Sequence, residues 1–263
     1  MKKLFSLLLA VLMLCTMLTA CTPNTSSDLL SDIRQRGHII VAMEGTWSPW
    51  TYHDETDALV GYDVEVAKKI GEKLGVEVQF VEGEWDGLLG GLDSGRYDIM
   101  VNGVGITAER QQKYDFSTPY AYNRTAVIVR KDDNSIQSMA DLKGKKTANT
   151  ISSTYAAQAE SYGATVTAVD DLNQTIELLL GGRIDATLNA EAVYTDYVKA
   201  HPDANIKIAT FSDQVEQIAI PVRKDASTAS LLEAINAALA ELAADGTLSS
   251  LSEKYFGTDI SKN

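Results

Sequence analysis

"VNGVGITAER" (residues 101–110) places a hydrophobic strand, a Gly-x-Gly turn and the start of a helix within ten residues. Thr107 suits the N-cap of that helix, because its hydroxyl can accept a hydrogen bond from a first-turn amide. Arg110 then lies where the helix dipole favours negative side chains. A guanidinium beside exposed amides can clamp a carboxylate through two parallel hydrogen bonds. The stretch therefore predicts an anion-binding turn after a strand; the alternative is a surface arginine without a partner.

Strands and helices alternate on the N-terminal side of this stretch. Strands are predicted at 37–44, 76–82 and 96–104, and helices at 61–75 and 85–95. Asp63 is expected to cap the first of these helices. Such alternation is typical of parallel α/β sheets.

The C-terminal side repeats the alternation. Strands are predicted at 127–132 and 164–169, a helix at 153–163, a helix followed by a strand over 172–189, and two helices within 228–257 that are broken near Gly246. A chain of 263 residues exceeds what one ordinary core needs, so two lobes are expected.

An internal echo links the two halves. "GRYDIMVN" (95–102) and "GRIDATLN" (182–189) share Gly-Arg before a strand, Asp early in it and Asn at its end. One interpretation is a common helix-to-strand turn. The other is functional, because Asn102 and Asn189 fall at carboxyl ends of predicted parallel strands, where open α/β sheets bind ligands. Two such lobes facing one another would form a cleft.

Charge and motif content exclude several function classes. The net charge of −13 argues against nucleic acid and against a basic patch for anionic lipid. The sequence has no Ser-His-Asp order, no cysteine nucleophile and no metal-ligand spacing among His38, His53 and His201. Neither a metal nor a cofactor is expected.

The N-terminus has the pattern of an export signal. Lys2 and Lys3 precede an apolar run, and residues 1–20 are predicted to be a signal peptide. "LTAC" (18–21) resembles a lipobox, which implies cleavage before Cys21 and a palmitate-containing lipid anchor on its thiol; the alternative is an ordinary signal with a chance cysteine. Residues 21–29 are expected to be a polar tether. The chain without residues 1–20 loses two lysines and no acid, so it carries −15, and Cys21 has no disulfide partner.

Several separate blocks together resemble a known family. They are "GYDVEVAKKIGEKLG", "EWDGLLGGLDSGRYDIMVNGVGITAERQQKYDFSTPY", "DLKGKK" and "ALAELAADGTLSSLSEKYFG", in order across residues 30–257. They resemble the polar amino-acid solute-binding proteins (family 3) of bacterial ABC importers. The resemblance implies a two-lobed α/β fold of the type II periplasmic-binding class, with parallel-dominated sheets, helices on both faces and a hinge between lobes. It also implies a monomer, lipid-anchored at the outer face of the cytoplasmic membrane, that delivers an amino acid to an ABC permease.

The resemblance assigns binding roles to matched positions. Arg110 matches the arginine that binds the ligand α-carboxylate, and Ser153 and Thr154 match hydrogen-bond donors at a second-lobe helix start. Trp47 and Trp85 match aromatic walls of the ligand site, with core packing as the alternative for each. The segment that contacts ligand through backbone or short polar groups matches Asn102, Gly103 and Gly105.

One position departs from the family pattern. The aspartate that binds the ligand α-ammonium is replaced by Ala190. A buried ammonium still needs acceptors, and Glu44, Glu191 and Asn189 are the substitutes expected, with Glu44 preferred. An ordinary solvated strand-end carboxylate is the alternative for Glu44. The "TLNAE" variant resembles binders of cystine or similar polar amino acids.

Lobe 1 is predicted to comprise residues 30–122 and 218–263, and lobe 2 residues 123–217, because short strand-like crossings occur at "PYAYNRTA" and "EQIAIP".

Two other functions fit the same fold. A dehydratase-like enzyme would use Glu44 or Glu191 as its acid or base. A ligand-sensing domain would normally continue into a spanning helix.

Overall fold

The computed structural model describes residues 28–263, so the predicted signal peptide and Cys21 lie outside the described residues. The first helix, α2 (Leu29–Arg36), begins immediately: the Asp28 carboxylate caps it by accepting a hydrogen bond from the Ser31 amide at 3.0 Å. Asp28 and Leu29, which the sequence assigned to the tether, therefore belong to this helix. No helix in the described range 28–263 has the length and apolarity needed to cross a bilayer.

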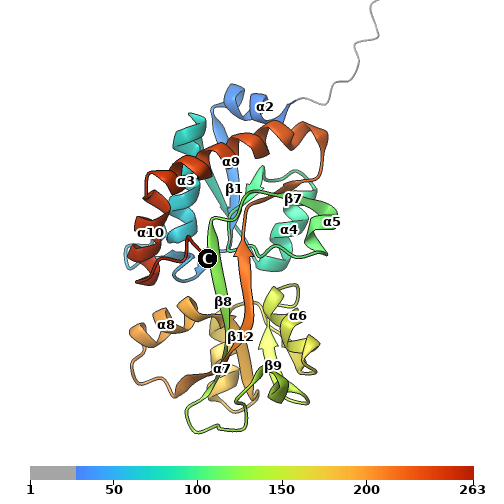
Figure 1. Cartoon of the computed structure of the whole chain (residues 1–263), viewed down its shortest axis with the longest axis vertical. Coiled ribbons are helices and arrows are strands. Elements are labelled where there is room, and N and C mark those ends of the chain that lie inside the picture. Colours follow the sequence, from blue (N-terminus) through green and yellow to red (C-terminus); the bar gives the residue numbers. More distant parts are fainter. Residues whose placement is uncertain (1–27) are drawn as a thin grey trace, which may run out of the picture.

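Figure 1 shows two lobes joined by two long strands. The sheet of lobe 1 is parallel, with strand order β5–β1–β6, built from β1 (His38–Met43), β5 (Glu77–Glu82) and β6 (Ile99–Met100). Its helices are α3 (Tyr62–Leu74), α4 (Trp85–Asp93), α9 (Ala229–Ala244) and α10 (Thr247–Phe256).

Strand β1 explains why helices cover both faces of this sheet. Successive side chains of a strand point to opposite faces. Ile39, Val41 and Met43 accordingly join the core built with α3 and α9. Ala42 joins a separate core with Leu88 of α4. The nearly continuous apolar sequence of β1 is thus the sequence of a strand buried on both sides.

Lobe 2 has the strand order β10–β9–β11–β8–β12. Strands β9 (Lys146–Asn149), β10 (Thr165–Ala168) and β11 (Ala186–Ala190) are parallel, whereas β8 (Ala121–Arg130) and β12 (Ile206–Ile218) add antiparallel pairs. Its helices are α6 (Thr154–Ser161), α7 (Leu172–Leu180) and α8 (Glu191–Ala200).

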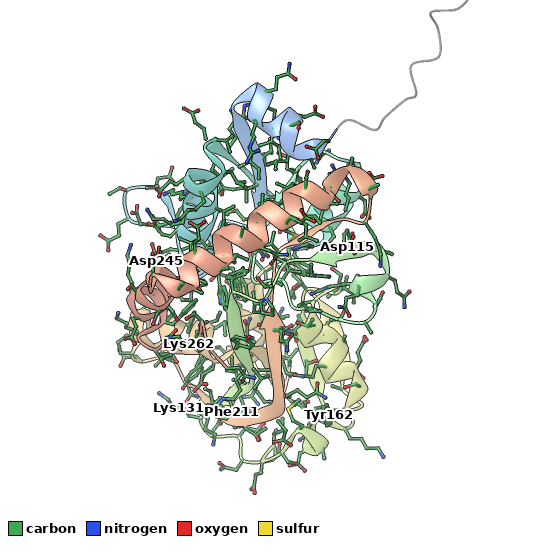
Figure 2. The ribbon with its side chains drawn as sticks, turned by 45° about the horizontal axis from the view of Figure 1, so that its top comes forward. Asp115, Lys131, Tyr162, Phe211, Asp245 and Lys262 are labelled. Carbon is green, nitrogen blue, oxygen red and sulfur yellow. The ribbon has the colours of Figure 1, made fainter. Side chains whose placement is uncertain are left out.

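Strands β8 and β12 pair from Ala121↔Ile218 to Arg130↔Ile206 and run from one lobe into the other (Figure 1). The sequence predicted only a short strand-like crossing at residues 216–221, whereas β12 begins ten residues earlier, at Ile206. In Figure 2, Asp115 and Asp245 lie near α9 in lobe 1, whereas Lys131, Tyr162 and Phe211 lie at the far end of lobe 2. The predicted lobe boundaries coincide with these two strands and stay a prediction.

The remaining elements are short. They are β2 (Thr46–Trp47), β3 (Thr51–His53) and β4 (Leu59–Val60), which form a small antiparallel sheet, β7 (Tyr114–Phe116), which pairs with β13 (Pro221–Arg223), α5 (Arg110–Lys113), and the 3-10 turns Met139–Leu142 and Ala226–Thr228.

Two local predictions need correction. Helix α3 is preceded by Gly61, and Asp63 does not cap it. Asp63 is instead fully buried, where it accepts hydrogen bonds from the Gly103 amide at 2.6 Å and the Tyr120 hydroxyl at 2.8 Å. Helix α5 begins at Arg110 rather than at Thr107, although the Thr107 hydroxyl does accept from the Arg110 amide at 3.1 Å.

The internal echo corresponds to equivalent places in the two sheets. Strand β6 lies beside β1 in lobe 1, and β11 lies beside β9 in lobe 2. The Asp98 carboxylate accepts from the Ile40 amide at 2.6 Å, and the Asp185 carboxylate accepts from the Lys146 amide at 2.8 Å. Each aspartate thus ties its strand to the neighbouring one, and the echoed turn has a structural role in both lobes.

Candidate functional site

A cavity of about 560 Å³, including its open side, lies between the lobes. Nine predicted site residues line it: Glu44, Trp47, Trp85, Asn102, Gly103, Arg110, Ser153, Thr154 and Asn189. Gly105 and Glu191 do not.

Arg110, which follows the Gly-x-Gly turn, lies at the wall of the cavity. Its side chain is buried, with the residue 8% exposed. The guanidinium donates to the Gly105 carbonyl at 2.9 Å and to the Ser152 carbonyl at 3.0 Å, and it lies 5.2 Å from the Trp85 ring centroid. Burial lowers the pKa of Arg110, with Glu216 the largest opposing charge. None of the ion pairs in residues 28–263 includes Arg110, so its remaining N–H groups suit an anionic ligand.

The two predicted tryptophans have different supports. Trp47 stacks on the buried Trp50 with ring centroids 5.3 Å apart. Gly103 has a φ of 56°, and a Cβ there would come within 2.5 Å of the Trp47 ring. Glycine is therefore required at 103 by Trp47 as well as by the turn. Trp85 begins α4, and its buried Nε1 has no hydrogen-bond partner among the described residues.

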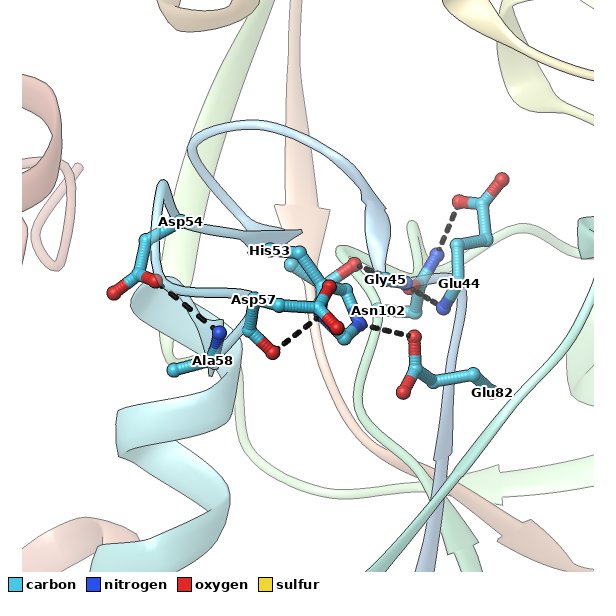
Figure 3. A network of polar contacts seen from close by, with 9 residues as sticks. Glu44, Gly45, His53, Asp54, Asp57, Ala58, Glu82 and Asn102 are labelled. Atoms are coloured by element: carbon cyan, nitrogen blue, oxygen red, sulfur yellow. Dashed lines mark hydrogen bonds and ion pairs between the residues drawn. The ribbon is translucent and has the colours of Figure 1, made fainter.

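Glu44 follows the end of β1 and is fixed by Asn102 (Figure 3). The Asn102 amide nitrogen donates to the Glu44 carboxylate at 2.7 Å, and its oxygen accepts from the Glu44 backbone amide at 2.8 Å. Burial raises the pKa of Glu44 to about 7, and the charges of Glu84, Asp171 and Asp86 add to the rise while Asn102 opposes it. Asn102 therefore positions Glu44 in addition to lining the cavity.

The start of α6 differs from the expected donor pair. The Ser153 hydroxyl donates to the Thr150 carbonyl at 2.6 Å and accepts from the Ala156 amide at 3.1 Å. The Thr154 side chain lies near the buried Glu216 carboxylate and opposes the rise that burial causes in its pKa. The Ser153 hydroxyl is thus engaged within the protein, because it caps the helix. What this helix start offers the cavity is the positive end of its dipole and its first backbone N–H groups.

Two of the expected ammonium acceptors, Glu191 and Asn189, already have hydrogen-bond partners within the protein. Glu191 begins α8 and pairs with Arg124, whose guanidinium donates to it at 2.8 Å on the exposed surface. The Asn189 side-chain oxygen accepts from the Ala190 amide at 2.8 Å and from the Trp47 indole at 3.4 Å. Neither group is therefore a free acceptor, and Glu44 is the predicted acid that reaches the cavity.

Gly105 also has a different role from the one predicted. A Cβ at this residue would lie 2.0 Å from the Glu216 carboxylate. Burial raises the pKa of Glu216, and Thr154, Asn123 and Arg110 oppose the rise. Gly105 thus makes room for a buried protein carboxylate, not for a ligand, and its carbonyl holds Arg110.

Sequence reasoning missed several lobe 2 residues. The cavity is also lined by Asn149, Thr150, Tyr155, Asp171, Leu172 and Thr175. Asn149 ends β9, and Asp171 lies between β10 and α7. The rule that singled out Asn102 and Asn189, polar residues after parallel strands, would have found both.

Hydrogen bonds join the lobes on either side of the cavity. The Ser48 hydroxyl donates to the Asp196 carboxylate at 2.7 Å, and the Ser152 hydroxyl donates to Asp86. Trp47 and Arg110 also reach across to Asn189 and Ser152. The lobes are therefore in contact around the cavity. Within residues 28–263, no cluster of three or more His, Cys, Asp or Glu side chains is suited to hold a metal ion.

Solved structures of similar sequence share this fold. An ancestral arginine-binding protein bound to arginine is 40% identical, has a TM-score of 0.78 and matches over 84% of this chain and 99% of its own. The unliganded, open L-cystine solute receptor of Neisseria gonorrhoeae is also 40% identical, with a TM-score of 0.61 over 90% of this chain and 100% of its own. The higher score against the ligand-bound structure agrees with the contacts between the lobes.

Sequence comparisons point to the same group. The L-cystine-binding protein TcyA of Bacillus subtilis is 40% identical over 236 residues, which cover 89% of this chain and 87% of the relative. Residues 39–258 match the profile of bacterial extracellular solute-binding proteins, family 3. The chain belongs to the bacterial extracellular solute-binding proteins of family 3.

Proposed function

We propose that this protein captures a polar amino acid between its lobes, with L-cystine as the preferred ligand, and delivers it to an ABC permease. The observation that carries the proposal is Arg110, a buried guanidinium that lines the cavity beside Trp85 and is in none of the ion pairs of the described residues. A bidentate guanidinium–carboxylate pair suits the α-carboxylate common to all amino acids.

The charges of the cavity favour a zwitterionic ligand. Arg110 and the start of α6 provide positive potential, and Glu44 provides a carboxylate held by Asn102. Separate anionic and cationic subsites match the α-carboxylate and α-ammonium of an amino acid. Proteins similar to this one include binders of L-cystine and of arginine, and cystine is placed first because two relatives named for it align over 89% of this chain.

The enzyme and sensor alternatives are not favoured by these comparisons, since the family consists of solute-binding proteins. The protein is exported, as the extracellular family indicates. We infer that the lipobox-like "LTAC" leads to a lipid anchor on Cys21 at the outer face of the cytoplasmic membrane, and that the protein acts as a monomer.

Calorimetric titration of the purified protein with L-cystine, L-arginine, L-glutamine and N,N′-diacetyl-cystine tests this function. We expect L-cystine to bind in the micromolar range or tighter, about −8 kcal/mol or more favourable. The diacetylated compound lacks the ammonium groups and is expected to bind far more weakly. Binding of no free amino acid in the panel, or turnover of a titrated compound, would contradict the proposal.

Closure of the lobes on the ligand is expected to be visible in solution. The strands β8 and β12 are the only paired strands that run from one lobe to the other in the described residues, and a change in their dihedral angles would swing the lobes. Small-angle scattering should therefore show a smaller radius of gyration with saturating ligand than without it. An unchanged radius with a tightly bound ligand would count against hinge closure.

A further inference from the structure

The inference concerns the acid missing at Ala190, and it rests on the proposed function. We infer that Asp171 supplies the second-lobe carboxylate for the ligand ammonium, which is held between Glu44 of lobe 1 and Asp171 of lobe 2. Glu191, the exposed acid next to Ala190, is already paired with Arg124 and does not line the cavity. The substitute for the absent carboxylate therefore comes from a different strand-to-helix connection of the same lobe.

The position of Asp171 follows from the sheet of lobe 2. Strand β10 lies beside β9, with Ala168 opposite Asn149, and both strands end at the cleft edge of the sheet. Asp171 comes three residues after Ala168, and it lines the same cavity as Asn149 and Glu44. Glu44 follows the corresponding end of β1 in the facing lobe. The two carboxylates thus approach the cavity from opposite lobes.

Only one oxygen of Asp171 is used by the protein. Its Oδ1 caps α7 by accepting from the Gln174 amide at 2.9 Å. In the described residues, Oδ2 has no hydrogen-bond partner, and Asp171 is in no ion pair there. The capping bond holds the side chain in place, so the second oxygen is oriented at little further cost in side-chain entropy.

A buried acceptor beside Asp171 points to the same ligand group. The Asn149 amide nitrogen donates to the Leu188 carbonyl at 2.8 Å, which leaves Oδ1 as the other polar atom of the amide. This oxygen is buried and has no partner among the described residues, and the residue is 4% exposed. A buried acceptor without a donor is costly. An ammonium has three N–H donors, which matches Glu44, Asp171 and Asn149.

Like charges facing one another give the ammonium a further role. The negative charge of Asp171 acts on Glu44 across the cavity, together with Glu84 and Asp86. Neither Glu44 nor Asp171 forms an ion pair with a basic side chain in the described part of the chain. The repulsion between the two carboxylates opposes closure of the lobes, whereas a cation bound between them attracts both carboxylates. The ligand ammonium therefore favours the closed arrangement.

Asp171→Asn tests the inference, because asparagine caps a helix as well as aspartate does and the change removes only the charge. Asp170→Asn is the matched control: Asp170 is the adjacent exposed acid, does not line the cavity and contacts Gln174 of the same helix. L-Cystine affinity should fall at least about tenfold in Asp171→Asn and change less than about threefold in Asp170→Asn. If Asp171→Asn is poorly folded by thermal melting, Asp171→Ser keeps a capping oxygen and replaces it.

A double-mutant cycle with Glu44→Gln separates a shared ammonium from two independent subsites. A shared ammonium predicts that the combined loss departs from the product of the two single losses by more than about threefold. Full affinity in Asp171→Asn, equal losses in Asp171→Asn and Asp170→Asn, or strictly multiplicative losses would each overturn the inference while leaving the proposed function in place. If the wild-type protein binds no amino acid, the proposed function fails, and the inference fails with it.

Discussion

Replacing Arg110 with alanine is expected to weaken amino-acid binding by about a hundredfold or more while leaving the fold intact. The guanidinium is buried and held by the Gly105 and Ser152 carbonyls, so it meets the ligand carboxylate without reorganising. Loss of a bidentate charge-assisted pair in such a site costs roughly 3 kcal/mol or more. Calorimetry with L-cystine measures the effect.

Two further variants make the Arg110 result specific. Arg110→Lys keeps the charge but loses the planar fork, so we expect an intermediate affinity. Arg96→Ala removes an exposed arginine of the same lobe and should bind as the wild type does. An Arg110→Ala affinity within about threefold of wild type, which is under 1 kcal/mol, would remove the carboxylate assignment.

Glu44→Gln is expected to lower L-cystine affinity at least about tenfold, or roughly 1.4 kcal/mol, at pH 8. The amide keeps the size of the side chain and removes the charge that an ammonium requires. Glu191→Gln is the matched control, because Glu191 is an exposed acid paired with Arg124 outside the cavity. A loss in Glu191→Gln with none in Glu44→Gln would reverse the assignment.

The raised pKa of Glu44 predicts that the affinity for the ligand depends on pH. Burial, with the facing charges of Glu84, Asp171 and Asp86, raises the pKa of Glu44 to about 7. The ammonium binds the ionised carboxylate, so affinity is full above pH 7 and is lost as the pH falls through it. Between pH 8 and pH 6 the wild-type affinity should fall about tenfold relative to Glu44→Gln, whose ratio corrects for titration of the ligand itself. Parallel pH profiles in the two proteins would contradict the role of Glu44.

The sequence alone identified the family and most of one wall of the site. The Gly-x-Gly turn before Arg110 and the echoed Asn102 and Asn189 were readable because they depend on local geometry and on which end of a strand they follow. Trp47 and Trp85 were assigned through the resemblance to the family, and both line the cavity. Local patterns such as the Gly-x-Gly turn can be recognised from the sequence alone, because their residues are neighbours in the chain.

Only the tertiary structure decided which polar groups remain available. Glu191 follows Ala190 directly in the chain, yet the Glu191 carboxylate pairs at the surface with Arg124, which is distant in the sequence. Asp63 lies where a capping residue is expected, yet it is buried against Gly103 and Tyr120. Gly105 gives room to Glu216 of β12, a contact between residues far apart in the sequence that the sequence did not predict.

The physical reason is that a polar group can be engaged by any partner that the fold brings close to it, including one that is distant in the sequence. Ser153 was expected to donate to a ligand, but its hydroxyl already donates to the Thr150 carbonyl. Asp171 was not among the predicted site residues, and it lines the cavity because β9 and β10 end side by side. The sequence by itself determined the residue types that an amino-acid site needs, and strand order and long-range pairing decided which of them face the ligand.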